Sequence, residues 1–104
     1  MADAIECEAA GEPAADGAVE VELFGVPRLL AGRRTLRVAG GTLGEAAVDL
    51  GARCPALVGT VIDRETGWLL DGYTFVVDER FTRDAARALT PASAVLLVSS
   101  VAGG

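Results

Sequence analysis

Residues 94–104 have the sequence AVLLVSSVAGG and contain the longest apolar run of the chain. The stretch 94–100 is apolar and rich in β-branched residues, which is typical of a strand that is buried on both faces of a sheet. We therefore predict a buried strand here that projects a flexible tail, with no linker between the two. The tail consists of Val101, Ala102, Gly103 and Gly104.

Two further strands are predicted near the beginning of the domain. Apolar and polar residues alternate over 19–23, and they alternate again over 35–39, which is the pattern of half-buried strands. Gly25, Pro27 and Gly32 mark the connection as a loop, so we expect these two strands to form a hairpin. The strand over 94–100 is expected to lie in the middle of the sheet, beside the strand over 19–23.

One amphipathic helix is predicted after the hairpin. Thr42 and Glu45 have the spacing of a capping box, and Pro55 is expected to end the helix at Cys54. Pro55 also opens a short second helical turn. The apolar stripe of the main helix consists of Leu43, Ala46, Ala47 and Leu50.

The weaker patterns predict short strands over 68–70 and 73–77 and one helical turn over 84–89. The fold class that follows is α+β, with one main helix and a short second helix on a mixed sheet. Alternation in the strands and the helix stripe together predict the core. Its central residues are Val21, Leu23, Leu36, Val38, Leu43, Leu50, Val95 and Leu97.

The composition excludes several kinds of catalytic site. The chain has no histidine, and all nine of its basic residues are arginine. Histidine-based metal sites, Ser-His-Asp triads, Schiff-base lysines and P-loop lysines are therefore absent. We expect no catalytic residue, no metal site and no permanently bound cofactor.

The net charge of −6 is unevenly distributed along the chain. Residues 1–18 hold five acidic residues and no basic one, whereas residues 19–104 hold ten acidic residues and nine arginines. We predict a disordered acidic tail over 1–18 and a folded domain over 19–100, followed by the flexible tail 101–104. An acidic tail beside a nearly neutral domain argues against a nucleic-acid partner.

The sequence indicates a soluble, cytoplasmic protein without a membrane partner. Its longest apolar run is far shorter than the ~20 residues of a membrane-spanning helix, and its acidic start is unlike a signal peptide. The two cysteines, Cys7 and Cys54, do not form a Cys-x-x-Cys pair or a disulfide framework. We expect Cys54 to be a small buried hydrophobic residue.

The order of these elements, with the ending Val-Ala-Gly-Gly, resembles the MoaD/ThiS family of ubiquitin-like sulfur carriers, which have the β-grasp fold. The resemblance covers residues 19–104 and includes Leu23-Phe24-Gly25 and 28–32. The long stretch between Cys54 and Tyr73 is more similar to the MoaD branch, the small subunit of molybdopterin synthase, than to the shorter thiamine branch.

The resemblance implies a sulfur carrier, which is a substrate of other enzymes and not itself an enzyme. An activating enzyme would use ATP to adenylate Gly104, and a sulfur donor would convert the adenylate into a thiocarboxylate. The implied sulfur acceptor is an enzyme such as the molybdopterin synthase large subunit. The absence of Cβ atoms at Gly103 and Gly104 suits a tail that enters a narrow channel.

Other functions remain open at this point. Related carriers supply sulfur to cysteine or to specialised metabolites, whereas a protein modifier would join Gly104 to other proteins. A third alternative is a ubiquitin-like module that binds without covalent attachment. For the carrier we expect one interface to bind the activating enzyme and later the acceptor enzyme, on the sheet face opposite the main helix, formed by Phe24, Leu96 and Val98.

Overall fold

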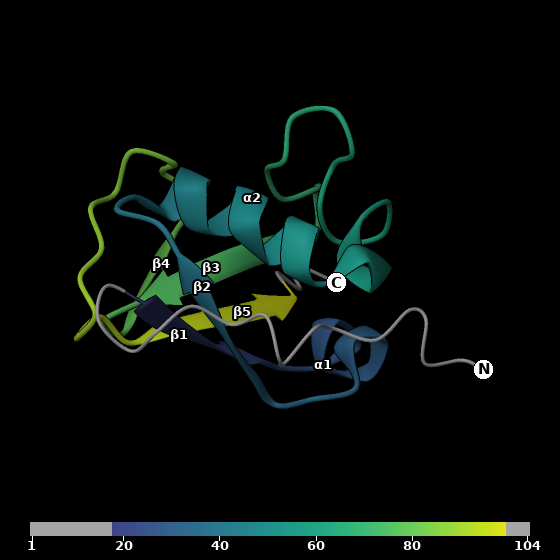
Figure 1. Cartoon of the computed structure of the whole chain (residues 1–104), viewed down its shortest axis with the longest axis horizontal. Helices are drawn as coiled ribbons and strands as arrows, with labels where there is room; N and C mark the ends of the chain where they lie inside the picture. Colours follow the sequence, from purple (N-terminus) through teal and green to yellow (C-terminus); the bar gives the residue numbers. More distant parts are fainter. Residues whose placement is uncertain (1–17, 100–104) are drawn as a thin grey trace.

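Five strands form one mixed sheet in the order β2-β1-β5-β3-β4 in the computed structural model, which describes residues 18–99 (Figure 1). The main helix, α2, lies across one face of this sheet. The elements are β1 (Ala18–Leu23), α1 (Val26–Ala31), β2 (Thr35–Ala39), α2 (Leu43–Arg53), η2 (Pro55–Leu57), β3 (Tyr73–Val77), β4 (Arg80–Thr82) and β5 (Val95–Ser99).

The last strand, β5, is the central strand of the sheet. It runs parallel to β1, with Val21 beside Val95, and antiparallel to β3, with Phe75 beside Leu97. This arrangement confirms the prediction that the apolar run lies in the middle of the sheet, next to the first strand. The strand is not buried on both faces as predicted, because Val95 and Leu97 point into the core whereas Leu96 and Val98 are half-buried on the opposite face.

The first hairpin is confirmed, but its connection is not a plain loop. Strand β1 begins at Ala18, one residue earlier than predicted, and pairs there with Ala39 of β2. Residues 26–31 form the short helix α1, which the sequence analysis missed. Pro27 lies in its first turn, and Gly32 ends it in the left-handed conformation. Both are regular helix-boundary signals.

Helix α2 has the predicted bounds and the predicted caps. The Thr42 hydroxyl accepts a hydrogen bond from the Glu45 N–H at 3.2 Å, and the Glu45 carboxylate accepts one from the Gly41 N–H at 2.8 Å. In the next turn, the Asp49 carboxylate accepts hydrogen bonds from Ala39 N–H, at 2.8 Å, and from Arg53 Nε, at 2.6 Å. Asp49 therefore ties the helix to the edge strand β2.

One of the weaker predictions is wrong, another is met only in part, and one strand was missed. Residues 68–70 form no strand and contribute one isolated bridge, between Leu69 and Ile62. Residues 84–89 form no helix, but they contain one hydrogen-bonded turn, from Arg87 N–H to Asp84 C=O at 3.0 Å. The backbone groups that follow bond to the start of α2, as in Leu89 N–H to Gly41 C=O at 2.9 Å. The missed strand, β4, follows β3 after a two-residue turn.

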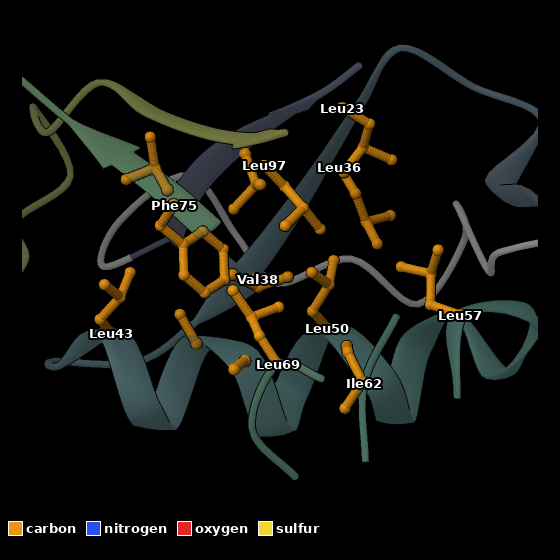
Figure 2. Packing of buried hydrophobic residues seen from close by; sticks show 14 of the residues in the cluster. Leu23, Leu36, Val38, Leu43, Leu50, Leu57, Ile62, Leu69, Phe75 and Leu97 are labelled. Atoms are coloured by element: carbon orange, nitrogen blue, oxygen red, sulfur yellow. The ribbon is translucent and has the colours of Figure 1, made fainter. Parts of the chain in front are cut away.

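The predicted core is confirmed. Its eight central residues are at most 2% exposed, and Figure 2 shows Leu43 and Leu50 of α2 pointing towards the sheet residues Val38 and Phe75. Phe75 is the largest fully buried side chain, and the sequence analysis did not include it. The apolar pattern after Pro55 predicts that Leu57, Val58, Val61 and Ile62 point inward. Leu57, Val61 and Ile62 are buried, whereas Val58 is half-buried.

Cys54 is fully buried at the junction of α2 and η2, in agreement with its predicted burial. Its sulfur is not a free thiol, however, because the residue is disulfide-bonded. The expectation that Cys54 is simply a small hydrophobic residue is therefore wrong in this respect.

Candidate functional site

The end of β5 lies beside the beginning of α1. The Phe24 N–H donates to the Leu97 carbonyl at 3.1 Å, which extends the β1–β5 pairing by one residue. Gly25 then turns the chain into α1 with φ 64° and ψ −133°, a conformation that favours glycine. A Cβ atom on Gly25 would lie 3.8 Å from the Ser99 hydroxyl oxygen. The chain therefore leaves β5 next to the first turn of α1.

The predicted tail residues continue from this point. Val101, Ala102, Gly103 and Gly104 lie outside the described residues, as does the predicted acidic tail except for Ala18. Ser99 is the last residue whose position the structure gives. What the structure contributes to the site is therefore the surface around the end of β5.

The three residues predicted for the partner interface lie on the sheet face opposite α2, which we call the open face. Leu96 and Val98 are half-buried there, whereas their neighbours Val95 and Leu97 point into the core. Phe24 is 37% exposed, next to the end of β1. The structure thus brings the three side chains to one region, and their role in binding stays a prediction.

The structure adds two residues to this region that the sequence analysis did not identify. In the sheet register Leu96 lies beside Val76 of β3, and Val76 lies beside Phe81 of β4. The Phe81 side chain is 74% exposed. We call the resulting surface the apolar patch, which consists of Phe24, Val76, Phe81, Leu96 and Val98.

Phe81 escaped prediction because β4 has only three residues and an unusual turn precedes it. Asp78 and Glu79 both have positive φ, 52° and 73°, as in the turns that join tight hairpins. Such turns normally contain glycine or asparagine, so the sequence carried no strong signal for this one. The only indication was an apolar residue, Phe81, two positions after the acidic pair.

Acidic side chains border the apolar patch on one side. Glu22 lies beside Leu96 in the parallel register, and Glu20 lies beside Arg37 of β2. Glu20 and Glu22 also line a depression of about 350 Å³ on this face, together with Thr35 and residues 91–96. The open face therefore combines an apolar centre with a polar border, which is the usual composition of a protein interface.

Within residues 18–99, no group of three or more His, Cys, Asp and Glu side chains could hold a metal ion. In the same part of the chain, no helix has the length and apolar composition needed to cross a membrane. The acidic residues on the turns, such as Asp63 and Asp71, are partly or fully exposed.

Comparison with known proteins gave matches among solved structures. No protein-family model matches the chain, and no curated protein matches it. The crystal structure of SAMP1 from Haloferax volcanii is similar with a TM-score of 0.71 and 30% sequence identity, over 85% of this chain and 100% of that one.

Two further structures share the fold at lower sequence identity. The solution structure of small archaeal modifier protein 1 from Methanosarcina acetivorans has a TM-score of 0.71 and 21% identity, over 85% of this chain and 97% of that one. A chain in the crystal structure of the Amycolatopsis orientalis BexX/CysO complex has a TM-score of 0.67 and 20% identity, over 84% of this chain and 100% of that one. These likenesses confirm the predicted β-grasp fold.

Proposed function

The chain belongs to the ubiquitin-like β-grasp family of small sulfur carrier and modifier proteins, and on this premise we propose that Gly104 is its reactive end. In this proposal Gly104 is the C-terminal residue, and its carboxylate is activated by a separate enzyme that uses ATP. The observation that carries the proposal is the position of β5. This central strand is followed in the sequence, after Ser100, by Val101, Ala102, Gly103 and Gly104.

The proposed reaction has two steps. A carboxylate oxygen of Gly104 attacks the α-phosphorus of ATP, which forms an acyl-adenylate and releases pyrophosphate. A sulfur nucleophile at the oxidation level of sulfide then attacks the acyl carbon, and AMP leaves. The product is a thiocarboxylate on Gly104, which can deliver its sulfur to an acceptor.

The residue types of the tail suit these steps. Gly103 and Gly104 carry no Cβ, so the backbone can approach the wall of a narrow channel closely and adopt either sign of φ. The acyl carbon of Gly104 is also unhindered. The chain supplies no acid, base or metal in this scheme, and it acts as a substrate of the activating enzyme.

For the sulfur acceptor we propose the molybdopterin synthase large subunit, which the resemblance to the MoaD branch favours. Delivery of sulfur to cysteine or to specialised metabolites is the alternative within the same chemistry. The BexX/CysO complex supports a partner-bound carrier in general, because a chain of the same fold forms a complex there. Transfer assays with each candidate acceptor and the thiocarboxylate form of the chain would distinguish these routes.

A protein modifier is the second candidate function, and the similarity to SAMP1, a small archaeal modifier protein, favours it. A modifier would join Gly104 to amines of other proteins. Since the chain has no lysine, it could extend itself only through its N-terminus. Immunoblotting of cell extracts distinguishes the two functions, because a carrier gives one band and a modifier gives a ladder of larger conjugates.

The apolar patch is proposed as the surface that binds the activating enzyme and later the acceptor. We expect Val98→Arg to weaken both complexes by at least about tenfold, because a charge would replace a central apolar contact. The free energy of unfolding should change by less than about 1 kcal/mol, since Val98 is half-buried on an open face. Isothermal titration calorimetry with each partner and chemical denaturation measure the two effects.

Val48→Arg provides a matched control for this prediction. Val48 is 55% exposed on α2, on the other side of the sheet, so its replacement should leave both affinities unchanged. Phe81→Ser provides a second test of the patch, because a ring that is 74% exposed contributes little to the core. If Val98→Arg and Phe81→Ser bind both partners as tightly as the parent chain, the apolar patch is not the interface.

A further inference from the structure

Positive charge is concentrated in one stretch of the domain. Residues 23–44 contain four arginines and no acidic residue, whereas residues 45–99 contain five arginines and eight acidic residues. Residues 18–22 add two glutamates. The stretch that includes α1 and β2 therefore has a net charge of +4, the highest of any stretch of the described domain, whereas residues 80–99, with three arginines and one acidic residue, have a net charge of +2. We call its arginines the basic surface: Arg28, Arg33, Arg34 and Arg37.

The basic surface extends from α1 into β2. Arg28 lies in the last turn of α1 and is exposed, as is Arg34. Arg33 Nε donates to the Thr35 carbonyl at 2.8 Å, which fixes this side chain along the beginning of β2. Arg37 lies beside Glu20 in the β1–β2 register and already has an acidic neighbour. Arg28 and Arg34 are therefore the arginines best placed to attract further negative charge.

This surface lies next to the place where the chain leaves β5. Helix α1 begins at the Gly25 turn, where an added Cβ would lie 3.8 Å from the Ser99 hydroxyl oxygen. The helix carries two exposed aliphatic side chains, Val26 and Leu29, which are 39% and 80% exposed. Any enzyme that receives the tail must approach this side of the molecule. A segment bound to the basic surface would stand in the way of that approach.

The chain itself contains a segment of complementary charge. Residues 1–17 carry five acidic residues and no basic one, and they join the domain at Ala18. Ala18 lies beside Ala39 of β2, at the opposite end of β1 from α1. The six residues of β1 span roughly 20 Å, whereas seventeen extended residues can reach about 56 Å. The segment is therefore long enough to reach the basic surface.

We propose that, when its cysteines are reduced, residues 1–17 bind to the basic surface of their own domain and compete there with the partner that receives the tail. Exposed ion pairs are individually weak, so several of them must act together and the bound segment must exchange with a released one. A partner then binds only the released fraction, which lowers its apparent affinity by that fraction. The docking itself does not depend on the proposed function, whereas the competition rests on it.

Amide NMR spectra test the docking without any partner. The full chain is compared with a chain lacking residues 2–17, at about 50 mM and about 500 mM NaCl. Both samples are kept reduced, because Cys7 lies in the segment and Cys54 in the core, and only charge should then hold the segment. We expect the amides of residues 28–37 to differ between the two chains at low salt and to coincide at high salt.

A neutralised chain of full length is the matched control, with asparagine or glutamine at its five acidic positions, Asp3, Glu6, Glu8, Glu12 and Asp16. We expect its spectrum over residues 28–37 to coincide with that of the truncated chain at both salt concentrations. Docking is overturned if low-salt differences occur only next to Ala18. It is also overturned if the neutralised chain shows the same differences as the parent.

Competition is tested by the affinity for the activating enzyme. We expect the truncated and the neutralised chains to bind at least about threefold more tightly than the parent at low salt, with the difference lost at high salt. Equal affinities at low salt would overturn the competition. The NMR comparison needs no enzyme, so its result does not depend on the proposed function. A failure of the proposed function can therefore be distinguished from a failure of the docking.

Discussion

A chain that lacks Gly103 and Gly104 is expected to lose all adenylation by its activating enzyme while keeping its thermal stability. The loss should be complete, because the deletion removes the carboxylate that attacks ATP and places the new end two residues short of the active site. Stability should be retained because the buried cluster extends in sequence from Val19 to Leu97, so the deletion removes none of it. ATP–pyrophosphate exchange and thermal unfolding measure the two properties.

A chain extended by one alanine after Gly104 is the matched control for this deletion. It keeps every native residue but moves the carboxylate away from Gly104, so it should be equally inactive and equally stable. Retained exchange activity in the truncated chain would contradict both the carrier and the modifier function. Loss of stability in the truncated chain would contradict the view that the tail contributes little to the core.

Leu50→Ala is expected to lower the free energy of unfolding by ~2–5 kcal/mol. Leu50 is fully buried, and Figure 2 shows it pointing from α2 towards Val38 of the sheet. The substitution would remove apolar contacts and leave a cavity between the helix and the sheet. A loss of this size is a large share of the ~5–15 kcal/mol by which a domain is typically stable. Chemical denaturation measures the loss.

Val48→Ala on the same helix is the control for this substitution. Val48 is 55% exposed on the opposite side of α2, so its truncation should change the free energy of unfolding by about 0.5 kcal/mol or less. If Leu50→Ala costs well under about 1 kcal/mol, the inward face of α2 has been assigned wrongly. A similar cost for both variants would lead to the same conclusion.

The parts of the fold that were predicted correctly have strong local patterns. Apolar and polar residues alternate from Val19 to Leu23 and from Thr35 to Ala39, which requires one buried face and one more exposed face. The sheet provides both. Helix α2 has a capping box, an apolar stripe and a proline after its end, so its bounds follow from the sequence alone. The central position of β5 follows from its unbroken apolar character.

The parts that were missed depend on contacts between distant segments. Residues 84–89 have a locally helical pattern, but the Leu43 N–H donates to the Arg87 carbonyl and the Leu89 N–H to the Gly41 carbonyl, both at 2.9 Å. These long-range bonds hold the segment against the start of α2, so that a single turn, from Arg87 N–H to Asp84 C=O, forms within it and no helix does. Residues 68–70 also depend on a distant segment. Trp68 packs against Phe75 with ring centroids 5.8 Å apart, and the three residues form no strand.

The candidate site was predicted in part for the same reason. Leu96 and Val98 follow from the alternation within β5, and Phe24 follows from its parity with Glu20 and Glu22. Val76 and Phe81 join them only through the pairing of β3 with β4 and β5. The turn at Asp78 and Glu79 that makes this pairing has no glycine, so the sequence did not reveal it.

The central claim is that sulfur is attached at Gly104, and the mass of that residue tests it most directly. The full chain is incubated with its activating enzyme, ATP and a sulfide source, and the product is fragmented in a mass spectrometer. The account predicts that the intact mass increases by the difference between sulfur and oxygen, and that the C-terminal fragment containing Gly104 carries the whole increase. An unchanged Gly104 fragment, with the sulfur on Cys7 or Cys54 or with no sulfur gained, would contradict it.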